Sequence, residues 1–321
     1  MPPPSAHPAG LPPPRSGPPP PLAPAEIERP VRNALDEDRG KGDLTSNTAV
    51  PEKARARASL IAKADGVLAG LAVFARTFEM CDRKVKIELL AQDGSKCRKD
   101  DVVALVEGSA RALLLAERTA LNFVQRLSGT ATLTARFVRL AREAAGDKAP
   151  RILDTRKTTP GLRVLEKYAV RCGGGENHRF GLYDEVMIKE NHIELAGRSI
   201  EAVLSDLRSV LGPTVRITCE ARDEGEALAA VDGGADVVLL DNIGAPELAR
   251  LCPLLRARAR ERSQTARTAQ TARTVELEAS GGVDERTIAA IAKSGVDRVS
   301  IGALTHSAPA LDLSLELEPL S

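Results

Sequence analysis

The second half of the chain alternates short apolar, β-branched runs with helix-like segments, and this alternation limits the folds open to it. The apolar runs are Ile152–Leu153, Val186–Ile188, Val215–Cys219, Val237–Leu240, Val275–Ala279 and Val299–Ile301. Helical patterns over 200–211, 223–231, 245–255 and 284–293 separate most of them. The alternation predicts parallel βαβ units. Six or more such units without a GxGxxG fingerprint favour a closed or nearly closed barrel over a dinucleotide-binding sheet.

Polar residues follow each predicted strand, at the end of a parallel barrel where chemistry takes place. They are Asp154, Arg156 and Lys157; Lys189, Glu190 and Asn191; Glu220; Asp241 and Asn242; Ser280, Gly281 and Gly282; and Gly302. Solvation explains any one of them as well as function does, but several of both signs indicate a site. Glycines at the last two strand ends suit a phosphate held by backbone N–H groups. The two acids suit ribose hydroxyls, Mg²⁺ bound through water, or positive charge developing at a sugar carbon.

The stretch 154–192 gathers cations around the glycine triplet 173–175. They are Arg156, Lys157, Arg163, Lys167, Arg171, His178, Arg179 and Lys189. A cationic pocket on strand ends would bind a polyanionic small molecule, and a solvated basic face is the alternative. His178 follows the glycines in a predicted loop, where we expect anion binding or proton transfer rather than core packing. Together with the acids and glycines, this stretch predicts that a phosphorylated sugar meets an anionic partner.

Two candidate functions compete with this interpretation. Lys189 stands at a strand end, where barrel aldolases place a Schiff-base lysine, and neighbouring cations or desolvation would activate its amine. Asp43, with Thr45 and Ser46, offers oxygens to a metal. For that segment we expect instead a turn that caps the next element.

The first half of the chain predicts a small α+β domain. Alternating segments between 56 and 107 read as strands with one solvated face, and a helix over 70–80 lies between them. A short helix starts near Ala25 and runs through Leu35. A long helical pattern covers 110–145, with a break predicted at 128–130. Arg118 lies on that helix, and its position alone indicates nothing beyond a surface arginine.

Composition excludes several classes of protein. The net charge is +1 and aromatic residues make up 2%, so neither a basic field nor a base-stacking platform for nucleic acid is available. No apolar run approaches the ~18 residues of a membrane span. Five cysteines without a CxxC pair favour a reduced, cytoplasmic setting. The Pro-rich residues 1–24 and the low-complexity insert 256–274 are expected to be a disordered extension and a helical extension or disordered loop.

Several motifs in the chain resemble the quinolinate phosphoribosyltransferase family. They are GDLTS, ERTALNFVQRLSGTAT, LDTRKTTPGLRVLEKYAVRCGGGENHR, MIKENH, VVLLDN, LEASGG and VSIGALTHSAPALDLSLE, in order from about residue 36 to 317. The resemblance implies an α/β fold in which an N-terminal α/β sandwich precedes an incomplete, open TIM-like α/β barrel. It implies transfer of phosphoribose from 5-phosphoribosyl-1-diphosphate to quinolinate with Mg²⁺, giving nicotinate mononucleotide, pyrophosphate and CO₂ for NAD synthesis. It also implies a homodimer or a hexamer of dimers with shared active sites.

The resemblance assigns roles residue by residue. The implied quinolinate-binding set is Arg118 from a neighbouring subunit, Arg156, His178, Arg179 and Lys189. Lys157 and Lys189 would also meet the pyrophosphate or phosphate groups. Glu220 and Asp241 would serve the ribose and Mg²⁺, and Ser280, Gly281, Gly282 and Gly302 would hold the 5-phosphate. Lys157, Lys189, Glu220 and Asp241 are the expected catalytic residues.

The resemblance also suggests domain boundaries and leaves alternatives. We expect an N-terminal domain over 25–130, a barrel domain over 131–305, and residues 306–321 returning to the N-terminal domain. Relatives often carry a second acid where this chain has Arg222, which bears on Mg²⁺ binding. A paralogue of the same fold with another acceptor, such as the molybdenum-associated relative, a Lys189 Schiff-base lyase and a binding-only protein are the alternative functions.

Overall fold

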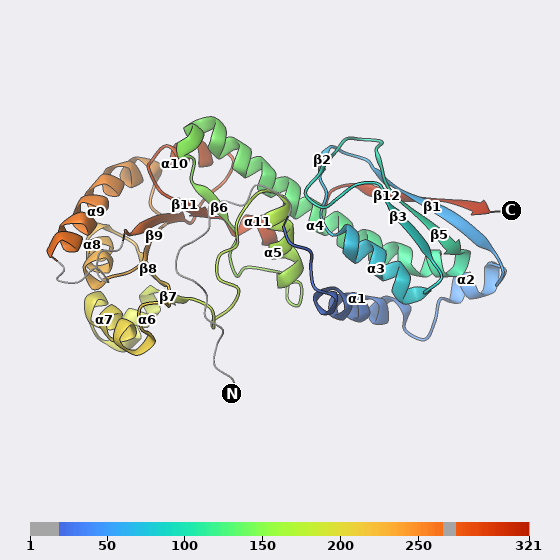
Figure 1. Ribbon diagram of the computed structural model, residues 1–321, viewed down its shortest axis with the longest axis horizontal. Helices are drawn as coiled ribbons and strands as arrows, with labels where there is room; N and C mark the ends of the chain where they lie inside the picture. Colours follow the sequence, from blue (N-terminus) through green and yellow to red (C-terminus); the bar gives the residue numbers. More distant parts are fainter. Residues whose placement is uncertain (1–18, 266–273, 321) are drawn as a thin grey trace.

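The computed structural model describes residues 19–265 and 274–320, which form two lobes joined by one long helix (Figure 1). None of the helices in these ranges is long and apolar enough to cross a membrane. The first 18 residues of the expected Pro-rich extension lie outside the described ranges. So do residues 266–273 of the expected low-complexity insert.

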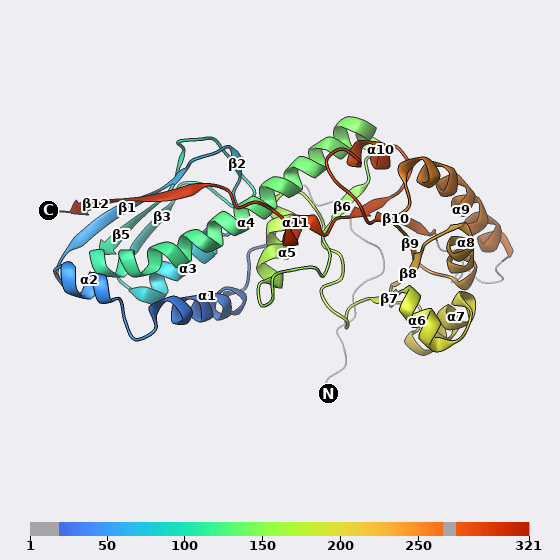
Figure 2. The ribbon, with the colours of Figure 1, turned by 180° about the vertical axis from the view of Figure 1, so that it is seen from behind.

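The N-terminal lobe is built on an antiparallel sheet of order β12-β1-β5-β3. Its strands are β1 (Arg55–Ala62), β3 (Lys86–Leu89), β5 (Val102–Ser109) and β12 (Leu313–Leu320), and a separate ribbon pairs β2 (Gly66–Val67) with β4 (Lys96–Cys97). The helices of this lobe are α1 (Pro24–Arg39), α2 (Leu44–Ala49), α3 (Leu71–Cys81) and the first half of α4 (Ala110–Ala145). Burial alternates along β1, and the inward residues Ala58 and Leu60 pack with Phe74 and Phe78 of α3. The last strand of the chain therefore lies beside β1, the first (Figure 2).

The predicted helix break at 128–130 is wrong, because α4 continues without interruption over 36 residues. Ser128 stays helical and its hydroxyl instead bonds the backbone N–H of Ala69 at 3.0 Å. Gly129 is needed for a close approach: a Cβ there would lie 2.0 Å from the carbonyl oxygen of Pro309. These small residues mark the place where the returning C-terminal segment crosses the helix, which sequence periodicity alone does not show.

The second lobe is an open parallel barrel of order β6-β11-β10-β9-β8-β7. Its strands are β6 (Arg151–Leu153), β7 (Val186–Ile188), β8 (Ile217–Ala221), β9 (Val237–Asp241), β10 (Glu276–Ser280) and β11 (Arg298–Ser300), and a short 3₁₀ turn, η1 (Gly146–Lys148), precedes them. Outside them lie α7 (Ile200–Leu211), α8 (Glu224–Gly233), α9 (Ala245–Thr265) and α10 (Ile288–Ala292) (Figure 1). The predicted α/β fold with an incomplete TIM-like barrel is confirmed.

The barrel is open between β6 and β7, which share no pairing within the described ranges. Residues 154–185 span this opening. We call this segment the seam. This segment contains α5 (Arg163–Cys172), which was not predicted from the sequence. Two further helices, α6 (Glu190–Ala196) and α11 (Ala303–His306), were not predicted either. Leu165 and Ala169 of α5 pack in a cluster with Leu127 of α4 and Val31 of α1. The basic stretch thus lies at the one side of the barrel that no strand pairing closes.

Candidate active site

Alternation along the barrel strands separates core residues from site residues. Cys219, Leu240 and Ala279 face outward into the helix-covered core, so their neighbours Glu220, Asp241 and Ser280 face the interior. The parallel register pairs Ala221 with Leu240 and Ser280 with Asp241, which brings these strand ends to one level. The strand ends that were predicted from sequence therefore meet at one mouth.

Lys189 and Glu220 form an ion pair at this mouth. Lys189 directly follows β7, Glu220 lies in the adjacent β8, and Nζ and Oε2 are 2.6 Å apart. The Lys189 side chain is 49% exposed and that of Glu220 is 13% exposed. The ammonium is therefore available to an anionic ligand while its carboxylate partner stays fixed in the wall.

Asp241 is the second carboxylate of the mouth. Burial raises the pKa of Asp241 above its ordinary value, and the nearby Glu220 raises this pKa further, whereas Lys189 and Lys157 oppose the rise. Two acids and two lysines from three strand ends and the seam therefore act on one another electrostatically. Such a constellation suits a ligand in which positive and negative centres lie close together.

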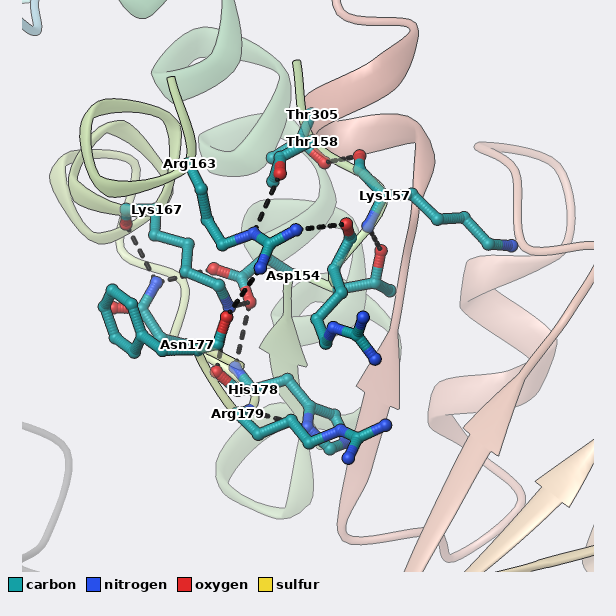
Figure 3. Close-up of polar contacts among 12 residues, drawn as sticks. Asp154, Lys157, Thr158, Arg163, Lys167, Asn177, His178, Arg179 and Thr305 are labelled. Atoms are coloured by element: carbon teal, nitrogen blue, oxygen red, sulfur yellow. Dashed lines mark hydrogen bonds and ion pairs between the residues drawn. The ribbon is translucent and has the colours of Figure 1, made fainter. Parts of the chain in front are cut away.

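Arg156 and Lys157 are neighbouring cations of the seam, and the charge of Lys157 acts on Asp241. The Arg163 guanidinium donates to the carbonyl oxygen of Arg156 at 3.3 Å and to the Thr158 hydroxyl at 3.0 Å. The Thr305 hydroxyl donates to the carbonyl oxygen of Lys157 at 2.7 Å. These bonds fix the backbone, and the exposed Lys157 side chain extends away from the cluster (Figure 3). The predicted cations thus stand on a restrained loop.

Contrary to the prediction, Lys167 does not belong to an accessible cationic pocket, and Asp154, predicted as a polar strand-end residue, is not exposed either. Both are fully buried, with Nζ 2.5 Å from Oδ1, and Nζ also donates to the carbonyl oxygen of His178 at 2.8 Å. Asp154 further accepts from the Asn177 amide and the His178 backbone N–H. Burial raises the pKa of the Asp154 carboxyl, an effect that the Lys167 ammonium opposes. The pair ties α5 to the loop that carries His178 and Arg179 (Figure 3).

His178 and Arg179 are both buried, although a loop position after glycines predicted an accessible histidine. The imidazole Nδ1 accepts the Arg179 backbone N–H at 2.7 Å, and Nε2 lies 3.4 Å from Glu278 of β10. Burial, followed by the charge of Arg156, lowers the pKa of Arg179. Two guanidinium groups therefore stand near one another on the seam, and an anion between them would relieve their repulsion.

Glycines line the wall of the mouth formed by the ends of β10 and β11, where the absence of side chains leaves the backbone accessible. Gly281 and Gly282 adopt φ of 87° and 60°, and a Cβ on Gly281 would lie 2.2 Å from Asn242 Oδ1. A Cβ on Gly302 would lie 3.0 Å both from Lys157 Cδ and from His306 Nε2. His306 was not predicted as a site residue. The sequence signal for it is weak, because it consists only of a position four residues after Gly302. Backbone, lysine and imidazole together suit a phosphate.

Arg118 is the one predicted site residue that the chain does not bring to the mouth. It is exposed on the half of α4 whose neighbours Ala116 and Ala120 pack on the N-terminal sheet. Phe137 of the same helix, which packs in the barrel core, is 19 residues further along, or about 28 Å at the rise of an α-helix. Arg126 of the same helix, only eight residues or about 12 Å from Arg118, donates to the carbonyl oxygen of Thr305 beside Lys157, but Arg118 itself forms no hydrogen bond or ion pair with the other cations' loops among the described residues.

The mouth offers oxygen ligands but no complete metal cage. Among the described residues, no three His, Cys, Asp or Glu side chains cluster in a way that could hold a metal. Arg222, two residues past Glu220, pairs with Glu190 and with Glu226, the latter at 2.6 Å. Asp43 caps α2 by accepting the Ser46 N–H at 2.9 Å, which confirms the turn prediction for that segment.

Comparison with known proteins gives matches over most of the chain. Residues 43–128 match the family model "Quinolinate phosphoribosyl transferase, N-terminal domain" and residues 130–316 match the C-terminal domain of the same name. The chain is 41% identical over 292 residues, 91% of this chain and 93% of the relative, to the "Probable nicotinate-nucleotide pyrophosphorylase [carboxylating]" of Bacillus subtilis (strain 168). It is 36% identical to the tobacco "Quinolinate phosphoribosyltransferase [decarboxylating] 2a, mitochondrial", across 89% of this chain and 80% of that one. The solved NadC of Streptococcus pyogenes is 38% identical with a TM-score of 0.82, covering 94% of this chain and 99% of that one.

Proposed function

Since the chain belongs to the quinolinate phosphoribosyltransferase family, we propose that its barrel mouth carries out the reaction of that family. Phosphoribose passes from 5-phosphoribosyl-1-diphosphate to the ring nitrogen of quinolinate, pyrophosphate leaves, and CO₂ is lost to give nicotinate mononucleotide for NAD synthesis. One observation carries the assignment: Lys157 of the seam and Lys189 at the end of β7 act on the acids of β8 and β9, Glu220 and Asp241, at one barrel mouth.

Quinolinate is a dianion, and the seam supplies the charge to bind it. Arg156 and Arg179 offer planar guanidinium forks that can orient carboxylates, and Lys189 adds a point charge. The repulsion between Arg156 and Arg179 favours an anion between them. Binding quinolinate draws Lys189 toward the substrate and frees Glu220 of the 2.6 Å ion pair. His178 belongs to this set through its bond to the Arg179 backbone.

The sugar phosphate lies along the opposite wall. Ser280, Gly281, Gly282 and Gly302 offer backbone close to the 5-phosphate, and Lys157 lies over Gly302. Departure of pyrophosphate leaves positive charge on the ribose, which Glu220 and Asp241 stabilise from below. Once the ring nitrogen carries the ribose, its charge accepts the electron pair that CO₂ leaves behind, and a proton replaces CO₂. The protein then needs to hold the reactants in line and exclude water.

Mg²⁺ fits the donors that are present. It prefers oxygen ligands, keeps several waters, and binds through one or two carboxylates together with substrate phosphates rather than in an all-protein cage. Glu220 and Asp241 are two such carboxylates. The pKa of Asp241 is raised first by burial and then by the charge of Glu220, and a cation would relieve the repulsion between the two acids. We assign these two residues to Mg²⁺, through water. The ion would neutralise charge on the pyrophosphate that leaves.

The second subunit supplies Arg118 in this proposal. Arg118 is exposed on the N-terminal lobe and forms no hydrogen bond or ion pair among the described residues, so its guanidinium is available to the mouth of a neighbouring subunit. We propose a homodimer, alone or as part of a hexamer of dimers, with two shared sites. All five cysteines are free, and four of them are buried, which suits a protein of the reducing cytoplasm.

One assay tests the reaction. The purified full-length chain is incubated with quinolinate, 5-phosphoribosyl-1-diphosphate and Mg²⁺, and nicotinate mononucleotide and pyrophosphate are quantified together. Equal amounts of both products are expected, and chelation of Mg²⁺ should stop the reaction. Nicotinate in place of quinolinate is the control for a different acceptor. Turnover of another pyridine acid, or release of pyrophosphate without nucleotide, contradicts the assignment.

Mixed dimers test the shared site. Arg118→Ala and Lys189→Ala proteins should each be inactive, because each removes a cation from every site. After subunit exchange, one site of each heterodimer is free of both changes, so activity should return to roughly a quarter of the wild-type value for random pairing. Exchange is verified with differently tagged subunits. No recovery in verified heterodimers contradicts the assignment of Arg118.

The Schiff-base alternative receives less support from the geometry. A nucleophilic lysine needs desolvation or a neighbouring cation to become a free amine at neutral pH. Lys189 is half exposed and its Nζ meets a carboxylate at 2.6 Å, which favours the ammonium. Borohydride with a carbonyl substrate should therefore leave Lys189 unmodified.

A further inference from the structure

The ring nitrogens of His178 have their protonation fixed by their surroundings. Nδ1 accepts the backbone N–H of Arg179 at 2.7 Å, so Nδ1 carries no proton. A histidine with one acceptor nitrogen is neutral and must carry its proton on Nε2. The Arg298 Nη2 atom, 3.2 Å from Nε2, is also a donor, so this contact is not a hydrogen bond. The Nε2 proton needs an acceptor elsewhere.

Glu278 provides that acceptor. Its side chain is fully buried in the barrel, where Arg298 Nε donates to Oε2 at 2.6 Å. The other oxygen, Oε1, has no completed hydrogen bond among the described residues and lies 3.4 Å from His178 Nε2. Burial raises the pKa of Glu278, but the charge of Arg298 and the hydrogen-bonding groups of His178 and Ser300 outweigh it and hold this pKa down at about 2, so the carboxylate is ionised at neutral pH. A buried anion with one open oxygen thus faces the one N–H of the imidazole.

We infer that Glu278 is a positioning residue of the quinolinate pocket: it fixes the Nε2–H tautomer of His178, and through it the backbone that presents the Arg179 guanidinium. This inference rests on the proposed function only in naming the ligand. It differs from the role of the mouth acids, because Glu278 touches no substrate. It also gives the buried His178 a role that direct anion binding does not explain.

Glu278→Gln tests this chain of contacts. Arg298 Nε remains a donor, so the glutamine amide must turn its oxygen to Arg298 and its NH₂ group to His178. Nε2 then becomes the acceptor and the proton moves to Nδ1, where it opposes the Arg179 N–H. Glu276→Gln is the matched control: Glu276 lies on the same strand and binds Arg151, Arg216 and Arg298, but it does not contact His178.

Two measurements separate positioning from mere stability. Long-range ¹H–¹⁵N spectra of ¹⁵N-histidine protein read the tautomer, and the His178→Gln protein assigns the signal among the four histidines. The wild type should show Nε2–H and Glu278→Gln should show Nδ1–H. The KM for quinolinate should rise roughly tenfold in Glu278→Gln while that for 5-phosphoribosyl-1-diphosphate stays within about twofold. Glu276→Gln should keep both the wild-type tautomer and the wild-type KM, even if its Tm falls.

The outcomes are decisive in both directions. An Nδ1–H ring in the wild type, an unchanged quinolinate KM in Glu278→Gln, or an equal rise in Glu276→Gln overturns the inference. If Glu278→Gln does not fold, Glu278→Asp keeps the charge beside Arg298 and withdraws the oxygen from Nε2 by about one C–C bond, ~1.5 Å. Loss of the Nε2–H signal with a selective KM rise is then expected. A wild type that makes no nicotinate mononucleotide refutes the proposed function, and quinolinate affinity by calorimetry then replaces KM in the same comparison.

Discussion

Two lysine–carboxylate pairs, one at the barrel mouth and one in the seam, have nearly the same length and opposite surroundings. Lys189 reaches Glu220 over 2.6 Å at the barrel mouth, with half of its side chain exposed. Lys167 reaches Asp154 over 2.5 Å, with both side chains fully buried. Water and ligands can reach Lys189 and replace its carboxylate partner, whereas neither can reach Lys167 or Asp154. Distance alone therefore says little about the role of an ion pair; access to solvent separates a binding group from a structural tie.

The largest effect on stability should come from breaking the buried pair. Lys167→Ala leaves the Asp154 carboxylate buried without its cation, which should lower the free energy of unfolding by about 3–5 kcal/mol. Urea unfolding followed by circular dichroism measures this change. Lys189→Ala is the matched control, because the same truncation is made at a pair of similar length. A loss below about 1 kcal/mol for Lys167→Ala would contradict a structural role.

At the mouth we expect a large effect on activity and a small effect on stability. Lys189→Ala should reduce kcat/KM for quinolinate roughly 100-fold or more, since it removes a charge that meets the reacting anions. Its free energy of unfolding should change by less than about 1 kcal/mol, as for an exposed pair. Steady-state kinetics and urea unfolding on the same preparation provide both values. Equal stability losses in Lys189→Ala and Lys167→Ala would abolish the distinction between the two pairs.

A smaller effect should show that the mouth opposes folding. The pKa of Asp241 is raised by burial and by Glu220, so its ionised form is less favourable in the folded state than in the unfolded state. Asp241→Asn should therefore increase Tm at pH 7 while it abolishes turnover. The increase should vanish as the pH falls below the ordinary value of 3.8, where Asp241 is protonated in both states. Scanning calorimetry at the two pH values measures it, and a lower Tm at pH 7 contradicts this prediction.

The fold was predictable wherever local pattern and tertiary packing agree. The β-branched runs predicted all six barrel strands, and the helix expected over 200–211 is α7 (Ile200–Leu211). Packing overrode local signals at 128–130, where the returning backbone at Pro309 needs Gly129 inside a continuous helix. The helix α5 was missed because RVLEKYAVRC was interpreted through its charges rather than through its apolar face.

The sequence was sufficient to predict which residues form the candidate site, but not which of their side chains are buried. Strand ends identified Lys189, Glu220 and Asp241, because the register of parallel strands brings such positions to one edge. The sequence gives no signal that Lys167 and His178 are buried while Lys157 is exposed, since all three lie in one basic stretch. Glu278 lies inside a predicted strand, and the strand pattern does not reveal its role, because that role depends on contacts with His178 and Arg298, 100 and 20 positions away in the chain.

The position of β12 also bears on how the chain matures during synthesis. The N-terminal sheet receives its outer strand from residues 313–320, which pair with β1 along its whole length from Arg55 to Ala62. On the ribosome β1 must therefore wait, with one edge unpaired, until residues 313–320 have been translated and have cleared the exit tunnel. A product that ends before β12 would keep this unpaired strand edge, which can pair with another chain. The order of synthesis thus delays closure of the first lobe until the second lobe has been made.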